Sequence, residues 1–277
     1  MEVYTQQAIA RALRLEPGQV QLRFLESVDS TNNELKRLAL QGAPAHTAVV
    51  SRVQLAGRGR RGRSFLSQEG GVYLSMLLRP AAPAQALLHL TAMTAVAVRR
   101  AVARACGVQT QIKWTNDLVS GGKKLCGILT ELGVGADGKT AEYVVIGVGV
   151  NCNQPGFSPE LSDVALSLRQ LCGQEVSCSV LAARMLEALV EMEQALFTQK
   201  EAWLREFSEN CVTLGRRVRL ARGNTLREAF AEGIDDQAAL LVRYDDGSRE
   251  AISSGEVSVR GMYGYQDDQN DGKGFSE

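Results

Sequence analysis

Apolar and polar positions follow two different periods along this chain, and the period of each stretch predicts its element. Apolar and β-branched runs predict strands at 20–24, 47–53, 72–79, 111–114, 124–132 and 143–150. Apolar positions at helical spacing predict helices at 5–15, 31–42, 84–106 and 177–207. The chain contains both strands and helices, and we expect an α+β fold with a mixed, largely antiparallel sheet. Helices should cover one side of the sheet and leave the other side for ligands.

Local signals mark the ends of several elements. Thr31 and Glu34 are spaced as in a capping box, so Thr31 should be the N-cap of the helix that stops at Gly42. The stretch 135–138 reads as the hairpin turn between the two strands that flank it.

The pattern changes after Asn210. Residues 211–262 form short alternating stretches with turns at 223–224 and 245–247, which is typical of a small SH3-like β-barrel. The final stretch is polar and acidic, and we expect it to be disordered. The predicted organisation is therefore a large domain at 1–209, a small β-barrel at 210–264 and a disordered tail at 265–277.

Composition excludes several classes of protein. The 277 residues include 31 Lys and Arg and 31 Asp and Glu, so the formal net charge is zero. A chain that is basic over its whole surface, such as a general nucleic-acid coat, is excluded. The two histidines, His46 and His89, are far apart, which excludes a multi-histidine metal site.

Cysteine usage and hydropathy predict a cytoplasmic protein. The six cysteines include no C-x-x-C pair and look like reduced core residues. No signal peptide is recognisable, because Glu2, Arg11 and Arg14 interrupt the first fifteen residues. The uncharged run between Arg79 and Arg99 contains prolines and polar residues, so it predicts a buried helix and no membrane partner.

A glycine- and arginine-rich loop occupies residues 57–63, with the sequence GRGRRGR. It matches G-x-G-x-x-G, but no helix follows and no acid lies about 20 residues on, which excludes a dinucleotide fingerprint. The run from Arg52 to Arg63 holds five basic residues and no acid. Arginine binds phosphate or carboxylate bidentately. The pattern alone leaves open a solvated loop, a non-specific RNA contact or a loop that closes over a polyanionic small molecule.

Three further segments combine polar and glycine residues at strand ends. KWTND at 113–117 can place a cation and a carboxylate in a functional loop, or be an ordinary Asn-Asp turn. Lys124 stands at the mouth of an apolar strand, where it can face a buried anion or solvent. GVGV at 147–150 places two glycines on one face, against which either a flat ligand or a helix can pack.

Taken together, these segments resemble the biotin protein ligase, or biotin–[acetyl-CoA-carboxylase] ligase, family. The resemblance rests on five motifs in the family's order and spacing: DSTN at 29–32, Gln54 with GRGRRGR at 57–63, KWTND at 113–117, KLCGIL at 124–129 and GVGVN at 147–151. They cover most of 25–155, and the predicted small β-barrel matches the family's C-terminal domain.

The resemblance implies a two-step reaction in the large domain. Biotin and MgATP form biotinyl-5′-AMP, and a lysine of a biotin carboxyl carrier protein of a biotin-dependent carboxylase then takes the biotin. Arg, Lys and Mg²⁺ can stabilise the charge in both steps without a histidine base. The resemblance also implies a monomer or homodimer, an open surface for the carrier, and loops at 57–71 and 115–123 that are mobile until the adenylate orders them.

The resemblance also assigns the site residue by residue. Arg60 and Lys124 are the implied catalytic residues, and Asp117 is the implied Mg²⁺ ligand. The implied biotin-binding set is Ser30, Thr31, Gln54, Gly57, Arg58, Arg60, Lys124, Gly127, Gly147 and Gly149. The implied ATP and adenylate set is Arg60, Arg63, Phe65, Lys113, Asn116 and Asn151, with Phe65 covering the adenine where the family often has Trp.

Two departures and two rival interpretations complete the sequence picture. Thr115 stands where the family usually has Pro, so the loop geometry there should differ slightly. Only about 25 residues precede the first motif, too few for the winged-helix domain of the repressor members, so we expect no DNA partner. The rivals are lipoate or octanoate ligation on the same general fold, and a non-catalytic RNA-binding or biotin-sensing module.

Overall fold

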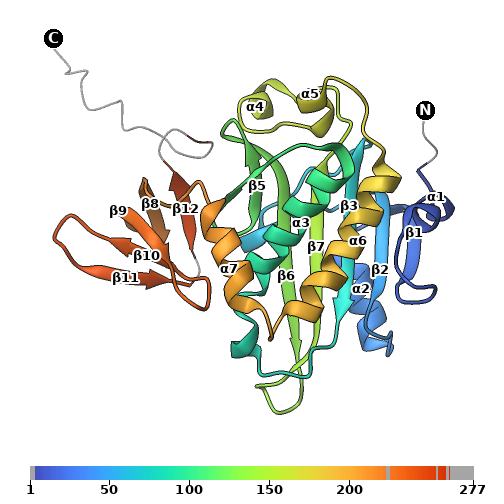
Figure 1. Ribbon diagram of the computed structural model, residues 1–277, viewed down its shortest axis with the longest axis horizontal. Coiled ribbons are helices and arrows are strands. Elements are labelled where there is room, and N and C mark those ends of the chain that lie inside the picture. The colour runs from blue at the N-terminus through green and yellow to red at the C-terminus, as the bar shows by residue number, and fades with distance from the viewer. Residues whose placement is uncertain (1–3, 223–224, 254, 260–261, 263–277) are drawn as a thin grey trace, which may run out of the picture.

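The computed structural model describes residues 4–222, 225–253, 255–259 and 262. The predicted tail and the turn at 223–224 lie outside these residues. A seven-stranded mixed sheet forms the large domain, in the order β1-β2-β3-β7-β6-β5-β4 (Figure 1). Its strands are β1 (Gln21–Val28), β2 (Thr47–Gln54), β3 (Gly71–Leu78), β4 (Gln111–Lys113), β5 (Asp117–Ser120), β6 (Lys123–Val134) and β7 (Ala141–Asn151). Only the β1–β2 pair is parallel, so the predicted mixed, largely antiparallel sheet is confirmed.

Helices cover the two faces of this sheet unequally. The helices α1 (Gln6–Ala12), α3 (Leu90–Cys106), α6 (Cys178–Ala195) and α7 (Lys200–Glu209) belong to the main core on one face. Only α2 (Thr31–Leu40) packs on the other face, against Val49, Leu77 and Val145. Successive strand residues point to opposite faces, so these three side chains face away from the main core. The prediction of helices on one side therefore holds for the long helices, and α2 is the exception.

Two of the predicted helices are each two elements. The stretch 84–106 divides into the 3-10 turn η2 (Ala84–Leu87) and α3, and 177–207 divides into α6 and α7. The break before α7 lets Trp203, Leu204 and Phe207 pack back against α3 instead of passing the core. By length and hydropathy the segment Ala84–Cys106 could cross a membrane, but 67% of its apolar window is buried inside the protein.

The start of α2 differs from the predicted capping box. Ser30 is the N-cap, and Thr31 is the first helical residue. The Thr31 hydroxyl contacts Gln54 Oε1 at 3.1 Å instead of capping the helix backbone. A tertiary partner has therefore replaced the local one that the spacing suggested.

Three elements that the sequence pattern did not predict lie close to the motifs. The strand β5 pairs with β4 and β6, so the loop predicted at 115–123 is largely a regular hairpin. The short helices α4 (Pro159–Ser162) and α5 (Leu168–Cys172) follow β7, and a capping box between Ser167 and Gln170 starts α5. The segment that they form hydrogen-bonds to the backbone of Lys124, through Val164 and Leu166.

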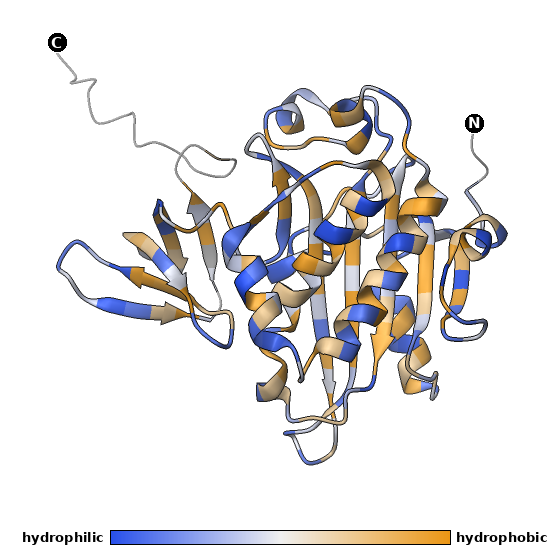
Figure 2. Ribbon diagram, viewed as in Figure 1, coloured by the Kyte–Doolittle hydropathy of each residue, from blue (hydrophilic) through white to orange (hydrophobic). Residues whose placement is uncertain are grey.

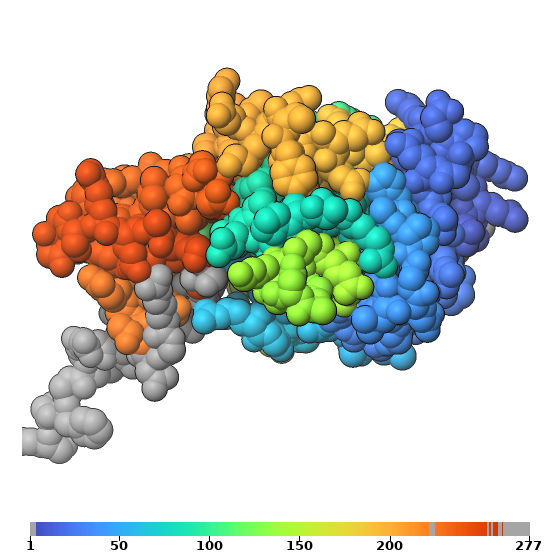
Figure 3. Space-filling model, turned by 90° about the horizontal axis from the view of Figure 1, so that it is seen from below, coloured from blue at the N-terminus to red at the C-terminus, as the bar shows by residue number. Residues whose placement is uncertain are grey.

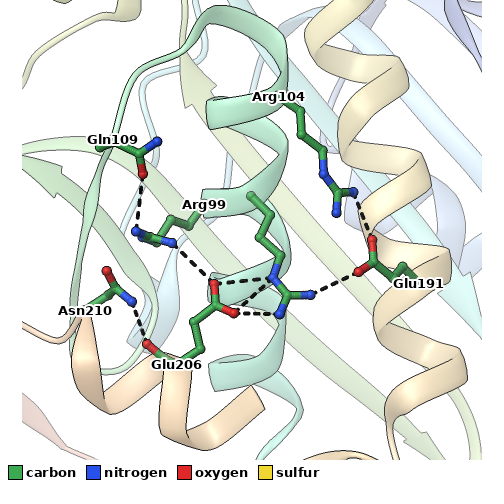
Figure 4. Close-up of polar contacts among 7 residues, drawn as sticks. Arg99, Arg104, Gln109, Glu191, Glu206 and Asn210 are labelled. Atoms are coloured by element: carbon green, nitrogen blue, oxygen red, sulfur yellow. Dashed lines mark hydrogen bonds and ion pairs between the residues drawn. The ribbon is translucent and has the colours of Figure 1, made fainter. Parts of the chain in front are cut away.

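An arginine–glutamate network ties α3, α6 and α7 together on the outer side (Figure 4). Arg100 binds Glu206 of α7 at 2.5 Å and Glu191 of α6 at 3.0 Å. The Arg100 guanidinium also lies 4.1 Å from the ring centroid of Trp203. Hydrophilic and hydrophobic residues alternate along the ribbons of these helices, whereas the strands that they cover are largely hydrophobic (Figure 2).

The small domain, which the alternating pattern predicted as a β-barrel of short strands, is an antiparallel five-stranded sheet. Its strand order is β11-β10-β9-β8-β12. The strands are β8 (Arg217–Arg222), β9 (Thr225–Ile234), β10 (Leu240–Arg243), β11 (Arg249–Ile252) and β12 (Glu256–Val259). The predicted turn at 245–247 joins β10 to β11, with Tyr244 and Ser248 hydrogen-bonded across it.

This domain lies beside the large domain (Figure 3), and the polypeptide that leads into it contacts β4. The backbones of Ile112 and Cys211 form a bridge, and the Trp114 indole donates to Ala238 O at 2.9 Å. These contacts bring β12 to the ligand side of the large domain, where its residues reach the cavity described next.

Candidate active site

A cavity opens on the α2 side of the sheet, between the start of α2, the arginine loop, the ends of β5, β6 and β7, and β12. Only Gly57 and Asn151 of the predicted site residues do not line it. Those that do are Ser30, Thr31, Gln54, Arg58, Arg60, Arg63, Phe65, Lys113, Asn116, Asp117, Lys124, Gly127, Gly147 and Gly149. Segments more than 100 residues apart in sequence therefore meet at one place.

The arginine loop is a closed hairpin in this structure. Phe65 N donates to Gly57 O at 2.9 Å, and Gly59 N donates to Arg63 O at 2.7 Å. A Cβ on Gly57 would lie 2.3 Å from the Phe65 carbonyl oxygen, so only glycine allows this closure. The hairpin explains why Gly57 is needed although it does not line the cavity.

Two cations face the cavity from different elements. Lys124 on β6 binds Asp117 Oδ1 at 2.8 Å, and Arg60 on the loop donates to Asn116 Oδ1 at 3.2 Å. Burial lowers the pKa of Arg60, although Asp117 opposes the shift. A guanidinium remains charged at neutral pH even so. The two cations can therefore bind an anion between them.

Among the described residues that line the cavity, Asp117 is the only carboxylate. Its Oδ1 also accepts from Asn116 Nδ2 at 3.3 Å. In the described part of the chain, no three His, Cys, Asp or Glu residues gather as a metal site. Magnesium in nucleotide sites takes one or two protein carboxylates and otherwise phosphate and water oxygens, so a single Asp117 fits that pattern.

The three predicted glycines approach two protein groups closely. A Cβ on Gly149 would lie 2.7 Å from the Phe65 ring, and one on Gly127 would lie 3.0 Å from it. A Cβ on Gly147 would lie only 2.0 Å from Asn32 Oδ1. The Phe65 ring therefore packs on the backbone of Gly127 and Gly149, and helix α2 packs on that of Gly147 through Asn32. Lys124 Nζ lies 5.7 Å from the centroid of the same ring.

The floor of the cavity is neutral and hydrogen-bonded. Gln54 Oε1 accepts from Thr31 N at 2.8 Å and lies 3.1 Å from the Thr31 hydroxyl, while Gln54 Nε2 donates to Ser67 at 2.8 Å. Ser75 on β3 lies beneath Thr31 and Asn32 and contacts both. Sequence reasoning gave no role to Asn32 and missed Ser75, which carries no motif; their contacts exist only once β3 lies beside α2.

Two predicted residues have roles away from the cavity centre. The Arg58 guanidinium turns to Asn33 Oδ1 at 2.8 Å and Glu131 Oε1 at 3.0 Å, which anchors the base of the loop. The Asn151 amide donates to the carbonyls of Lys124 and Leu166, behind the cavity. Asn151 therefore supports the strand that carries Lys124.

At Thr115, where the family usually has Pro, the peptide bond to Trp114 is cis.

Comparisons with known proteins agree with this geometry. The family described as "Biotin/lipoate A/B protein ligase family" matches residues 24–151, and "Biotin protein ligase C terminal domain" matches residues 213–260. The chain is 35% identical to the Bifunctional ligase/repressor BirA of Bacillus subtilis, over 84% of this chain and 72% of that protein. It is 32% identical to the Biotin--[acetyl-CoA-carboxylase] ligase of Paracoccus denitrificans, over 86% of this chain and all of that protein.

Solved structures give the same result. The biotin protein ligase from Aquifex aeolicus in complex with biotin and ATP superposes with a TM-score of 0.72 and 29% identity. The match covers 87% of this chain and 98% of that one. With both domains matched in sequence and in structure, the chain belongs to the biotin protein ligase family.

Proposed function

We propose that this protein is an ATP-dependent ligase that forms biotinyl-5′-AMP and transfers the biotin to a lysine of a biotin carboxyl carrier domain. The observation that carries the proposal is the division of one cavity into two parts. A neutral floor around Thr31 and Gln54 suits an uncharged polar ring, and a basic rim with Arg60 and Lys124 suits carboxylate and phosphate.

In the first step a carboxylate oxygen of biotin attacks the α-phosphorus of ATP, and pyrophosphate leaves. Arg60 and Lys124, on two sides of the cavity, hold the carboxylate and the α-phosphate together and stabilise the charge that develops between them. Asp117 keeps Lys124 oriented and can supply one oxygen ligand to Mg²⁺. A bound Mg²⁺ would neutralise phosphate charge and assist the departure of pyrophosphate.

Around the adenylate, other predicted residues have supporting roles. Arg63, Lys113 and Asn116 line the nucleotide side of the same cavity. Phe65 lies on the glycine wall and can cover the adenine after moving off the backbone of Gly127 and Gly149.

In the second step the ε-amine of the carrier lysine attacks the acyl carbon of the adenylate, and AMP leaves. The amide forms as the C–O bond to phosphate breaks, and the amine gives up a proton. The same cations stabilise the departing phosphate. The partner is the carrier domain of a biotin-dependent carboxylase, as the name of the Paracoccus denitrificans relative suggests.

Pyrophosphate release tests the proposal. With biotin and ATP the purified protein should release pyrophosphate, and a carboxylase carrier domain should then gain one biotin by mass. Lipoate and octanoate form the matched arms of the same assay. Labelling of the carrier by lipoate or octanoate, and not by biotin, would contradict the assignment.

A further inference from the structure

A continuous chain of hydrogen bonds runs beneath the cavity, from Glu131 on β6 to Thr31 at the start of α2. Asn32 Nδ2 donates to Glu131 Oε2 at 2.9 Å and to Leu129 O at 3.2 Å. The Ser75 hydroxyl, which is fully buried, lies 2.6 Å from Asn32 Oδ1 and 2.7 Å from Thr31 Oγ1. Thr31, Asn32 and Leu129 of this network line the cavity, whereas Ser75 and Glu131 do not.

Glu131, at one end of this series of hydrogen bonds, fixes the direction in which each group donates. Lys36 Nζ and Arg58 Nη1 each lie 3.0 Å from Glu131 Oε1. Burial alone would raise the pKa of Glu131, but the hydrogen bonds from Asn32 and Lys36 and the charge of Arg58 lower it overall. Glu131 is therefore an ionised acceptor. It and Leu129 O each need a donor, so the Asn32 amide nitrogen faces them and Asn32 Oδ1 faces Ser75.

Counting the available protons then fixes the group to which the Thr31 hydroxyl donates. Ser75 carries one proton, and Asn32 Oδ1 carries none, so the 2.6 Å contact takes the Ser75 proton. The 2.7 Å contact between Ser75 and Thr31 then needs the proton of Thr31. If Ser75 instead donated to Thr31, the buried Asn32 Oδ1 would face Ser75 at 2.6 Å without a proton, which is costly. The Thr31 proton therefore stays inside the protein, on Ser75, and the cavity meets an acceptor.

We propose that Ser75 and Glu131 are specificity-determining positioning residues, which make the Thr31 hydroxyl an obligate hydrogen-bond acceptor toward the ligand. The inference rests on the proposed function and deepens it. The site selects a ring that presents N–H at this point, as a cyclic urea does. It rejects a ring of the same shape that presents oxygen there, because two acceptors would then face each other without a proton.

Two substitutions release this constraint in different ways. In Ser75→Ala the Thr31 proton keeps only the 3.1 Å contact with Gln54 Oε1, which already accepts from Thr31 N. In Glu131→Gln a single side-chain oxygen remains for Lys36 and Arg58, so the new amide nitrogen faces Asn32 Nδ2. The Asn32 amide can avoid this contact by turning, at the expense of its hydrogen bond to Leu129 O, and Ser75 then no longer has to donate to Asn32. Either change lets Thr31 donate into the cavity.

The test compares biotin with its two cyclic carbamate analogues, in each of which oxygen replaces one ureido N–H. Pyrophosphate release gives kcat and KM for every ligand with the wild-type chain, Ser75→Ala, Glu131→Gln and Ser51→Ala. Ser51 is the matched control, because it is a fully buried serine on the adjacent strand β2 that donates to Val53 O. Thermal melting reports which variants are folded.

We expect the wild type to reject one carbamate by about 100-fold or more in kcat/KM relative to biotin. Ser75→Ala and Glu131→Gln should raise KM for biotin about 10-fold and reduce that discrimination at least 10-fold. Their kcat at saturating biotin and their KM for ATP should stay within about twofold of the wild type. Ser51→Ala should keep the full discrimination.

Unchanged discrimination in the folded variants would overturn the roles of Ser75 and Glu131. If Ser75→Ala does not fold, Glu131→Gln decides, because its side chain is partly exposed. An equal loss of discrimination in Ser51→Ala would mean that any small change in the sheet weakens discrimination between the ligands. That result would also overturn the proposal. Turnover of biotin by the wild type distinguishes these outcomes from failure of the proposed function. If the wild type does not turn over biotin at all, the proposed function itself is contradicted.

Discussion

The floor and the rim of the cavity are built on opposite principles. On the floor, Thr31, Asn32 and Ser75 are neutral and buried, and their hydrogen bonds are made to other protein groups. On the rim, Arg60 and Lys124 are charged and come from a loop and a strand end. The floor holds its geometry before any ligand arrives, whereas the rim holds charge for an anion that arrives later.

This difference separates shape recognition from catalysis. A buried hydrogen-bond network allows little adjustment, because any polar group that it leaves without a partner is costly. A cationic pair tolerates an anion that changes from carboxylate to acyl phosphate between steps. Changes on the floor should therefore act on KM for biotin, and changes on the rim should act on the rate of adenylate formation.

The largest effect should come from the rim. Lys124→Ala removes a donor from the developing charge, and adenylate formation should fall by about 1,000-fold or more. Rapid-quench measurement of biotinyl-5′-AMP checks this. Lys123→Ala is the matched control, since its ammonium binds Ser162 O outside the cavity, and it should leave the rate within about threefold. A similar loss in both variants would contradict a specific role for Lys124.

A steric change on the floor should come next. In Gly147→Ala the new Cβ would lie 2.0 Å from Asn32 Oδ1 and displace a buried amide. We expect KM for biotin to rise by about 10- to 100-fold, with a loss of about 1–3 kcal/mol in stability. Isothermal calorimetry with biotin and thermal melting measure both. Gly156→Ala, whose Cβ meets nothing within 4 Å, is the control and should behave as the wild type.

Phe65 stands between the two regions, and its removal should have a smaller effect. The ring packs on Gly127 and Gly149 and lies 6.4 Å from Tyr73 in an edge-to-face arrangement. Phe65→Ala should raise KM for ATP about 5- to 20-fold, because adenine would lose its aromatic cover. Phe65→Trp should restore it. Steady-state kinetics at saturating biotin distinguish the two, and an unchanged KM in Phe65→Ala would exclude this role.

The smallest expected effect is the loss of folding stability at acidic pH that comes from Glu131, beneath the floor. Because the folded pKa of Glu131 lies below its ordinary 4.5, the ionised carboxylate stabilises the fold above that pH. That contribution, about 1 kcal/mol or less, is lost as pH falls through the folded pKa. Urea unfolding of wild type and Glu131→Gln between pH 7 and pH 3 should show their stability difference narrowing below pH 4.5. A constant difference would contradict an ionised Glu131.

Sequence alone located the rim better than the floor. Arg60, Lys124 and Asp117 belong to contiguous motifs whose residue types already indicate anion chemistry, and the structure brings them into one cavity. Ser75 has no motif, because its role depends on the register that places β3 opposite Gly147.

Two other differences between the sequence predictions and the structure also arise from contacts between distant segments. The local spacing predicted Thr31 as a helix cap, but a partner 23 residues away took its hydroxyl. Asn151 lies in a motif, yet its amide binds the backbone of Lys124 and Leu166, which no spacing could indicate. Contacts between distant segments decide which side of a residue meets the ligand. The periodic pattern of the sequence does not contain this information.

The central claim is that one cavity joins biotin to AMP before any carrier takes part. Mass spectrometry of the products from the purified chain, incubated with biotin and ATP without carrier, tests it most directly. Biotinyl-5′-AMP should be found in amounts close to the protein concentration in the wild type, should be lost in Arg60→Ala, and should disappear when carrier domain is added. Transfer of biotin to carrier without any detectable adenylate would contradict the account.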